Sequence, residues 1–135
     1  MKIITYNYNI PKVPAVIIGQ KKSRDLDVEI SLGTDYFGNK IYGVLPLNLK
    51  KELELKTIGF ENFDRHGIIE KRSIVKPTII IRNHYKPVKI DGLCMFVYNG
   101  NDVIFSRMFL IKFLHVKRII MDFQSNKVSY VCFDY

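Results

Sequence analysis

The sequence predicts a single, mainly β domain that closes into a barrel and carries two short helices. Short runs rich in Ile and Val recur along the chain and are separated by turn residues, a pattern typical of strands. Only two segments space their apolar residues as a helix does. The 135 residues contain no internal repeat, linker or low-complexity segment, so residues 1–135 are expected to form one domain.

The first half is predicted to hold three strands and one helix. Residues 13–19 form the first strand, and residues 26–32 alternate apolar and polar side chains, as a strand with one buried face does. Residues 41–45 form the third strand. Pro46 suits a first helical turn, because its missing N–H would be unsatisfied there, and the leucines of residues 47–55 predict a short amphipathic helix.

The second half is predicted to hold more strands and the other helix. Residues 59–73 are polar and rich in turn residues, so a loop is expected there. Ser106 is a good N-cap for a helix over residues 107–114. The remaining strands are predicted from apolar runs at residues 79–81, 88–90, 93–97, 103–105, 116–123 and 127–133, and the last two runs form a hairpin.

The chain is basic, with a net charge of +8, and most of the excess lies in its second half. Such a charge attracts nucleic acid, an acidic partner or an anionic surface. Basic side chains interleaved with Tyr85, Phe109 and Phe113 are the candidate nucleic-acid contacts. Phe109 and Phe113 have helical spacing, so we expect them to face the core instead. The basic candidates are Lys71, Arg72, Lys86, Lys89, Lys112, Lys117 and Arg118.

Several classes of protein lack support in the sequence. No apolar leader or membrane-spanning run is visible, so no membrane partner is expected. Cys94 and Cys132 form no CxxC pair, which favours reduced thiols in a cytoplasmic protein and leaves open whether the two pair. The three histidines have no metal-ligand spacing, and no phosphate-binding or nucleophile motif is present. We therefore expect neither a metal nor a cofactor.

Three segments of the chain carry a family resemblance. They read Val-Glu-Ile-Ser-Leu-Gly-Thr-Asp at residues 28–35, Leu-Pro-Leu-Asn-Leu at residues 45–49 and Ile-Phe-Ser-Arg-Met-Phe-Leu at residues 104–110. Their order resembles the single-domain retropepsin-like aspartic peptidases, which include the retroviral proteases. There a strand runs into Asp-Thr/Ser-Gly, a Leu-Pro segment follows, and an apolar pair, a Gly and often an Arg open a late helix. The resemblance covers about residues 13–133 and implies a closed barrel and a homodimer.

The resemblance fails at the residue that carries the chemistry. The family's catalytic Asp falls on Gly33, its Thr on Thr34 and its Gly on Asp35, while the later Gly and Arg fall on Ser106 and Arg107. The family's reaction needs one carboxylate from each of two subunits, sharing a proton and activating a water. Gly33 has no side chain and cannot act as a base. Asp35, two positions further on, is expected to form a turn.

We therefore expect a non-catalytic, homodimeric module that binds an extended peptide or protein segment by adding a strand. The terminal segments at residues 3–6 and 128–133 are the expected pairing edges. One alternative is an aspartic peptidase with an atypical dyad built from Asp35 of two chains. The other is a basic nucleic-acid-binding protein of a mobile element or virus.

Overall fold

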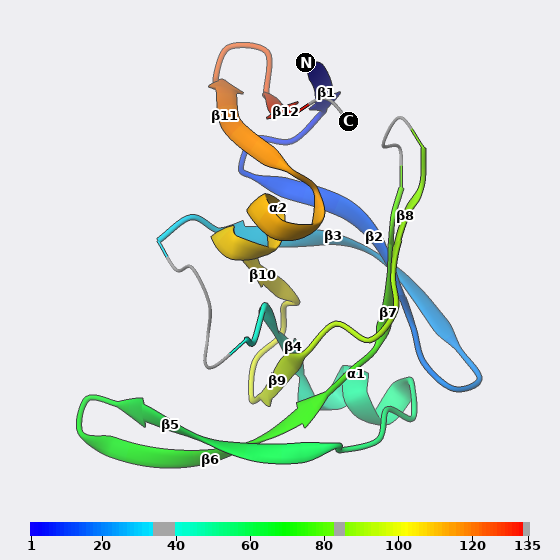
Figure 1. Ribbon diagram of the computed structural model, residues 1–135, viewed down its shortest axis with the longest axis vertical. Coiled ribbons are helices and arrows are strands. Elements are labelled where there is room, and N and C mark those ends of the chain that lie inside the picture. The colour runs from blue at the N-terminus through cyan, green and yellow to red at the C-terminus, as the bar shows by residue number, and fades with distance from the viewer. Residues whose placement is uncertain (34–39, 83–85, 134–135) are drawn as a thin grey trace.

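The computed structural model describes residues 1–33, 40–82 and 86–133, and within these ranges the protein is mainly β with two short helices, as predicted (Figure 1). The strands are β1 (Lys2–Tyr6), β2 (Lys12–Ile18), β3 (Ser23–Ser31), β4 (Gly43–Pro46), β5 (Gly59–Arg65), β6 (Ile68–Val75), β7 (Thr78–Ile81), β8 (Val88–Ile90), β9 (Met95–Tyr98), β10 (Ile104–Ser106), β11 (Val116–Asp122) and β12 (Lys127–Cys132). The helices are α1 (Leu47–Glu52) and α2 (Arg107–Phe113).

Two sheets make up the fold. The larger has the strand order β5-β6-β9-β4-β10-β3-β2-β7-β8 and curls into a half-barrel, and the smaller has the order β1-β12-β11. Within the described ranges the larger sheet has free edges at β5 and β8. The larger sheet is thus a curled half-barrel, and the closed barrel that was expected is not confirmed. Helix α2 contacts both β10 of the larger sheet and β11 of the smaller one.

The centre of the larger sheet contains two parallel pairs. Strand β10 pairs parallel with β3, strand β4 pairs parallel with β9, and β10 pairs antiparallel with β4. Strand β10 therefore lies between β3 and β4, and the turn at residues 99–102 links β9 to β10 across β4. That turn was expected from its Asn-Gly sequence, but the strands that it joins are not neighbours.

The core follows the predicted alternation. In β3, Val28 and Ile30 are buried, whereas Leu32 beyond the strand end is 40% exposed. Phe105 and Phe109 are fully buried and stack with ring centroids 4.1 Å apart. Phe109 therefore lies in the core, as its helical spacing predicted, and Phe113 is half-buried beside it.

Residues 59–73 form most of a β hairpin and not the expected loop. Strands β5 and β6 pair without a register shift, and His66 and Gly67 turn the chain with φ of 53° and 81°. The Gly67 N–H donates to the Asp64 carboxylate at 3.0 Å. Much of this hairpin projects from the body and is exposed, so it lacks the apolar–polar alternation by which a strand is predicted (Figure 1).

Helix α1 packs closely against the end of β2. Leu49 and Leu53 are buried, and a Cβ at Gly19 would collide with the Leu53 carbonyl, so only glycine fits this contact. The Gln20 N–H donates to the same carbonyl at 3.2 Å. The helix is shorter than predicted because Leu53 closes it, and Glu54 follows with φ of 53°.

Candidate functional site

The predicted site lies at the end of β3. Strands β3 and β10 are parallel neighbours, and Ser31 at the end of β3 pairs with Ser106 at the end of β10. The two strand ends therefore lie side by side. Leu32 and Gly33 continue from β3, and Arg107 begins α2 directly after β10. The fold thus places residues 29–31 and 104–106, which belong to two segments of the family resemblance about 75 positions apart in the chain, side by side. We call Ser31, Leu32, Gly33, Ser106 and Arg107 together the strand-end region.

Gly33 gives the strand-end region no acid or base. It is exposed, and a Cβ built on it would meet no atom within 4 Å, so the position has room for a side chain that the chain does not supply. Arg107 is exposed in the first turn of α2. Thr34 and Asp35 lie outside the described residues.

Ser106 is committed to capping a helix. Its side chain is fully buried, and its Oγ accepts a hydrogen bond from the Phe109 N–H at 3.2 Å, as predicted for the N-cap of α2. The Ser106 N–H donates to the Tyr42 carbonyl at 2.9 Å. A hydroxyl that is enclosed and serves as a cap cannot reach a substrate.

Ser106→Ala is expected to lower the free energy of unfolding by about 1–2 kcal/mol, because it leaves the buried Phe109 N–H without its acceptor. Urea unfolding followed by circular dichroism measures the loss. Ser23→Ala, at the exposed start of β3, is the matched control and should change stability by less than about 0.5 kcal/mol. Equal stability of the two variants would contradict the capping role.

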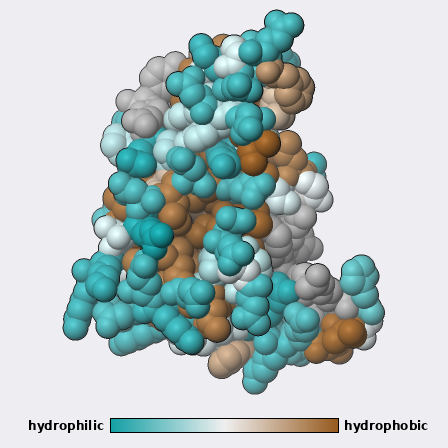
Figure 2. Space-filling model, turned by 180° about the vertical axis from the view of Figure 1, so that it is seen from behind, coloured by the Kyte–Doolittle hydropathy of each residue, from teal (hydrophilic) through white to brown (hydrophobic). Residues whose placement is uncertain are grey.

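The hairpin β5–β6 exposes apolar side chains. Phe60, Ile68 and Ile69 are 60%, 66% and 69% exposed, and the Lys71 ammonium lies over the Phe60 ring, 4.7 Å from its centroid. Seen from behind, hydrophobic side chains surface on the part that projects at the lower right (Figure 2). Strand β5 is also a sheet edge, so one row of its backbone N–H and C=O groups faces outward.

The basic candidates do not share one surface. Lys71 and Arg72 lie on β6, near one edge of the larger sheet, and Lys89 lies on β8 at the opposite edge, just after Lys86. Lys117 and Arg118 lie on β11 of the smaller sheet, at the far end of the molecule from β6 (Figure 1). Arg72 and Lys89 also have acidic neighbours, Glu70 at 3.2 Å and Asp91 at 3.7 Å. Tyr85 lies outside the described residues.

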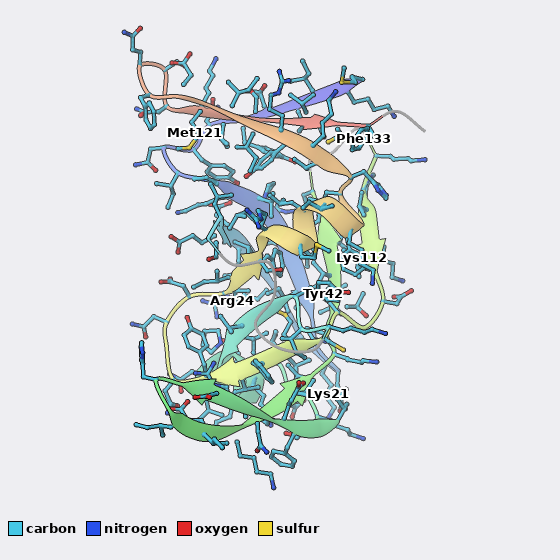
Figure 3. All side chains as sticks on the ribbon, turned by 60° about the vertical axis from the view of Figure 1, so that its left-hand side comes forward. Lys21, Arg24, Tyr42, Lys112, Met121 and Phe133 are labelled. Atoms are coloured by element: carbon cyan, nitrogen blue, oxygen red, sulfur yellow. The ribbon has the colours of Figure 1, made fainter. Side chains whose placement is uncertain are left out.

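Lys112 has a structural contact. Its Nζ donates to the Tyr42 hydroxyl at 2.7 Å and lies over the Tyr42 and Phe113 rings, 5.0 and 5.7 Å from their centroids (Figure 3). The Tyr42 and Phe113 rings meet edge to face at 5.1 Å. This contact connects α2 with the segment before β4, and it occupies both the cation and a ring that were candidates for binding nucleic acid.

Metal ligands, cysteines and long apolar helices can be assessed only within the described ranges. There, no three His, Cys, Asp or Glu side chains lie close enough to hold a metal ion. Cys94 is half-buried, Cys132 is buried, and both are free thiols. No helix in the described part of the chain is long and apolar enough to span a membrane.

One cavity was not predicted. It has a volume of about 270 Å³ and lies between the β2–β3 hairpin, helix α1 and the turn before β10. Its lining comes from three segments distant in the sequence, and none of them carries a known binding motif. Only the fold could reveal it.

The predicted site residues that the structure describes in the strand-end region therefore supply a glycine, a buried capping hydroxyl and an exposed arginine. None of these is a general base or a nucleophile at neutral pH. The apolar hairpin and the free strand edges instead offer surfaces for pairing with another chain. No known family model matches this chain, and no curated protein matches it.

Proposed function

We propose that this chain is a non-catalytic, retropepsin-like domain that forms a homodimer and holds an extended peptide. The observation that carries the proposal is the strand-end region. The parallel pairing of β3 with β10 supports the resemblance, because it brings residues 29–31 and 104–106 of the two segments together. At their meeting point Gly33 stands where the family has its catalytic carboxylate.

Loss of catalysis follows from the chemistry of that position. Hydrolysis by a carboxylate dyad needs one group to take a proton from water and another to hold a proton toward the substrate. Gly33 offers neither. A carboxylate displaced by two residues along the chain starts several ångströms from the required place, and a 1 Å error can cost about a hundredfold in rate.

The exposed side of β1, which carries Ile3, is the surface that we assign to the second copy. Strand β12 lies between β1 and β11, so both of its edges already pair within the chain. The expectation that residues 128–133 form a pairing edge for a second copy is therefore wrong. The β11 edge carries Lys117 and a register shift between Val116 and Arg118, two features that protect edges from pairing. Strand β1 pairs with β12 without a shift and presents Ile3, which is 55% exposed.

The peptide is assigned to the hairpin β5–β6. An extended peptide that pairs with the free edge of β5 gains backbone hydrogen bonds and can place an apolar side chain beside Phe60. The tip of the β5–β6 hairpin and the end of β3 both lie on the left-hand side of the molecule in Figure 1. This hairpin therefore offers both parts of strand-addition binding, an open edge and apolar contacts.

Two substitutions separate the dimer from the peptide site. Ile3→Asp is expected to weaken self-association about 100-fold, since it removes apolar contact and brings two carboxylates together. Ile68→Asp changes another exposed isoleucine, on the hairpin, and it should leave the dimer intact while weakening binding of a diverse synthetic peptide library. Sedimentation at micromolar concentration and fluorescence polarisation measure the two effects. A parent protein that is monomeric at these concentrations would overturn the dimer.

Incubation with the same library from pH 3 to pH 7 tests catalysis. We expect no cleavage by the parent or by Asp35→Asn. Cleavage by the parent that Asp35→Asn abolishes would establish an aspartic peptidase with a displaced dyad and refute the proposal. DNA binding that falls about a thousandfold between 50 and 200 mM salt, with no peptide binding, would favour a nucleic-acid-binding protein instead.

A further inference from the structure

The cavity beside α1 is lined by both apolar and charged side chains. Leu26, Leu49, Pro46 and Val103 supply apolar surface, while charged side chains of β2, β3, α1 and the turn before β10 surround it. At about 270 Å³ it lies just below the range of about 300–1,000 Å³ usual for ligand pockets. It therefore suits a group the size of one long side chain.

The charge of this cavity is opposite to that of the whole protein. Four carboxylates line it, those of Asp27, Glu29, Glu52 and Asp102, against two cations, Lys12 and Arg24. The chain as a whole has a net charge of +8. The cavity is thus a local region of negative potential on a basic molecule, which selects for cationic ligands.

Two of the four carboxylates already have partners. Arg24 Nη1 donates to both Glu52 oxygens, at 2.8 and 2.7 Å, and connects β3 to α1. The Tyr8 hydroxyl donates to Asp27 at 2.7 Å. Within the described ranges, the carboxylates of Glu29 and Asp102 have no ion pair or hydrogen-bond donor. They are the groups left for a ligand.

Glu29 and Asp102 act on the same neighbour. Burial raises the pKa of Tyr98, and the negative charges of Asp102 and Glu29 raise it further, although a hydrogen bond to the Asp102 backbone opposes them. Both carboxylates therefore lie near one phenol. Lys12 is opposite Glu29 in the β2–β3 register, and no ion pair between them is formed.

We propose that this cavity binds a compact organic cation, a guanidinium or primary ammonium group on a short aliphatic chain. The methylenes would contact the apolar lining residues, and the cationic head would contact the carboxylates of Glu29 and Asp102. The Arg24–Glu52 pair at the rim already uses the same guanidinium–carboxylate chemistry. A metal ion fits less well, because the carboxylates of the described residues nowhere converge in a group of three.

Titration of the full chain with n-butylguanidinium, followed by ¹H–¹⁵N chemical shifts, tests this site. A ligand of eight non-hydrogen atoms is expected to bind with a Kd of about 1 mM. Shifts should concentrate at the amides around Glu29, Leu49 and Asp102. Glu29→Gln and Asp102→Asn should each weaken binding about 10-fold, since each removes one charge-assisted contact.

Two controls make the result decisive. Asp91→Asn removes the same charge from an exposed turn outside the cavity, and it should leave the affinity unchanged. n-Butanol carries the aliphatic chain without the charge and should not bind. Equal affinity for butanol, equal affinity of all three variants, or no saturable shift up to 20 mM (a ceiling about twentyfold above the expected Kd) would overturn the proposal.

Titration with a second ligand distinguishes the possible sources of the cation. N-acetylarginine amide carries the same head within a peptide-like backbone. If it binds as butylguanidinium does, the cavity takes an arginine side chain of another protein; if only the free cation binds, the ligand is a small molecule. Both outcomes support the site, and neither depends on the dimer or on the hairpin.

Discussion

Raising the pH from about 10 to 12 is expected to destabilise the protein steeply, because buried tyrosines then have to ionise. Tyr6 and Tyr130 are 9% and 2% exposed, and their rings lie 5.9 Å apart between the smaller sheet and the body. Tyr8 lies 5.8 Å from Tyr6. Burial raises the pKa of Tyr6 to about 12 and raises the pKa values of Tyr8 and Tyr130 further.

The direction follows from proton binding in the two states. In the unfolded chain a tyrosine titrates near pH 10, whereas in the folded protein Tyr6 keeps its proton until about pH 12. Between these values the unfolded state releases protons that the folded state retains, so the free energy of unfolding falls as the pH rises. A shift of two pKa units corresponds to at most about 3 kcal/mol from Tyr6 alone, and the effect is absent below about pH 9.

Urea unfolding at several pH values between 8 and 12 measures this loss. Tyr6→Phe removes one titrating group and its 3.3 Å hydrogen bond to the Arg82 carbonyl. It should be slightly less stable than the parent at pH 8 and should lose less stability between pH 10 and 12. The same slope in both proteins would show that Tyr6 ionises as easily in the folded state as in the unfolded one.

Local signals in the sequence were sufficient for most elements. Ser106 was predicted to cap a helix because a short hydroxyl side chain preceded a helical apolar pattern, and its Oγ does accept from the third helical residue. The alternation at residues 26–32 predicted β3, and Val28 and Ile30 are buried as that pattern requires. Each of these features depends on residues that are close together in the sequence, so a local pattern is enough to predict it.

Features that depend on distant segments were predicted less well. Residues 59–73 were expected to be a loop, whereas they form most of the hairpin β5–β6. Much of this hairpin projects from the core and carries no alternating pattern, so nothing local in the sequence indicated strands. Closure of the larger sheet into a barrel was also expected and is not confirmed. Closure depends on whether β5 and β8 meet, which the pattern of neither strand determines. The cavity is lined from three segments, and its unpaired carboxylates Glu29 and Asp102 lie 73 positions apart by number, so no spacing rule could join them.

Phe109→Ala is expected to lower the free energy of unfolding by about 3–5 kcal/mol, the largest loss from a single substitution considered for this protein. Phe109 is fully buried and packs on Phe105 at 4.1 Å and on Phe113 at 5.6 Å. Truncation removes these contacts and leaves a cavity that the surrounding strands cannot fill without moving. A domain of this size has about 5–15 kcal/mol of stability in total, so the variant would lose a large part of it.

The position of Phe109 adds a consequence for the strand-end region. Its N–H donates to Ser106 Oγ, and its helix contacts both sheets, so loosening this side chain weakens the attachment of the smaller sheet as well as the cap. Urea unfolding measures the loss, and amide hydrogen exchange should show increased opening in α2 and β11. Phe123→Ala, at a phenylalanine that is 76% exposed, is the control and should change stability by less than about 0.5 kcal/mol. Similar stability of both variants would mean that α2 does not join the two sheets through its phenylalanines.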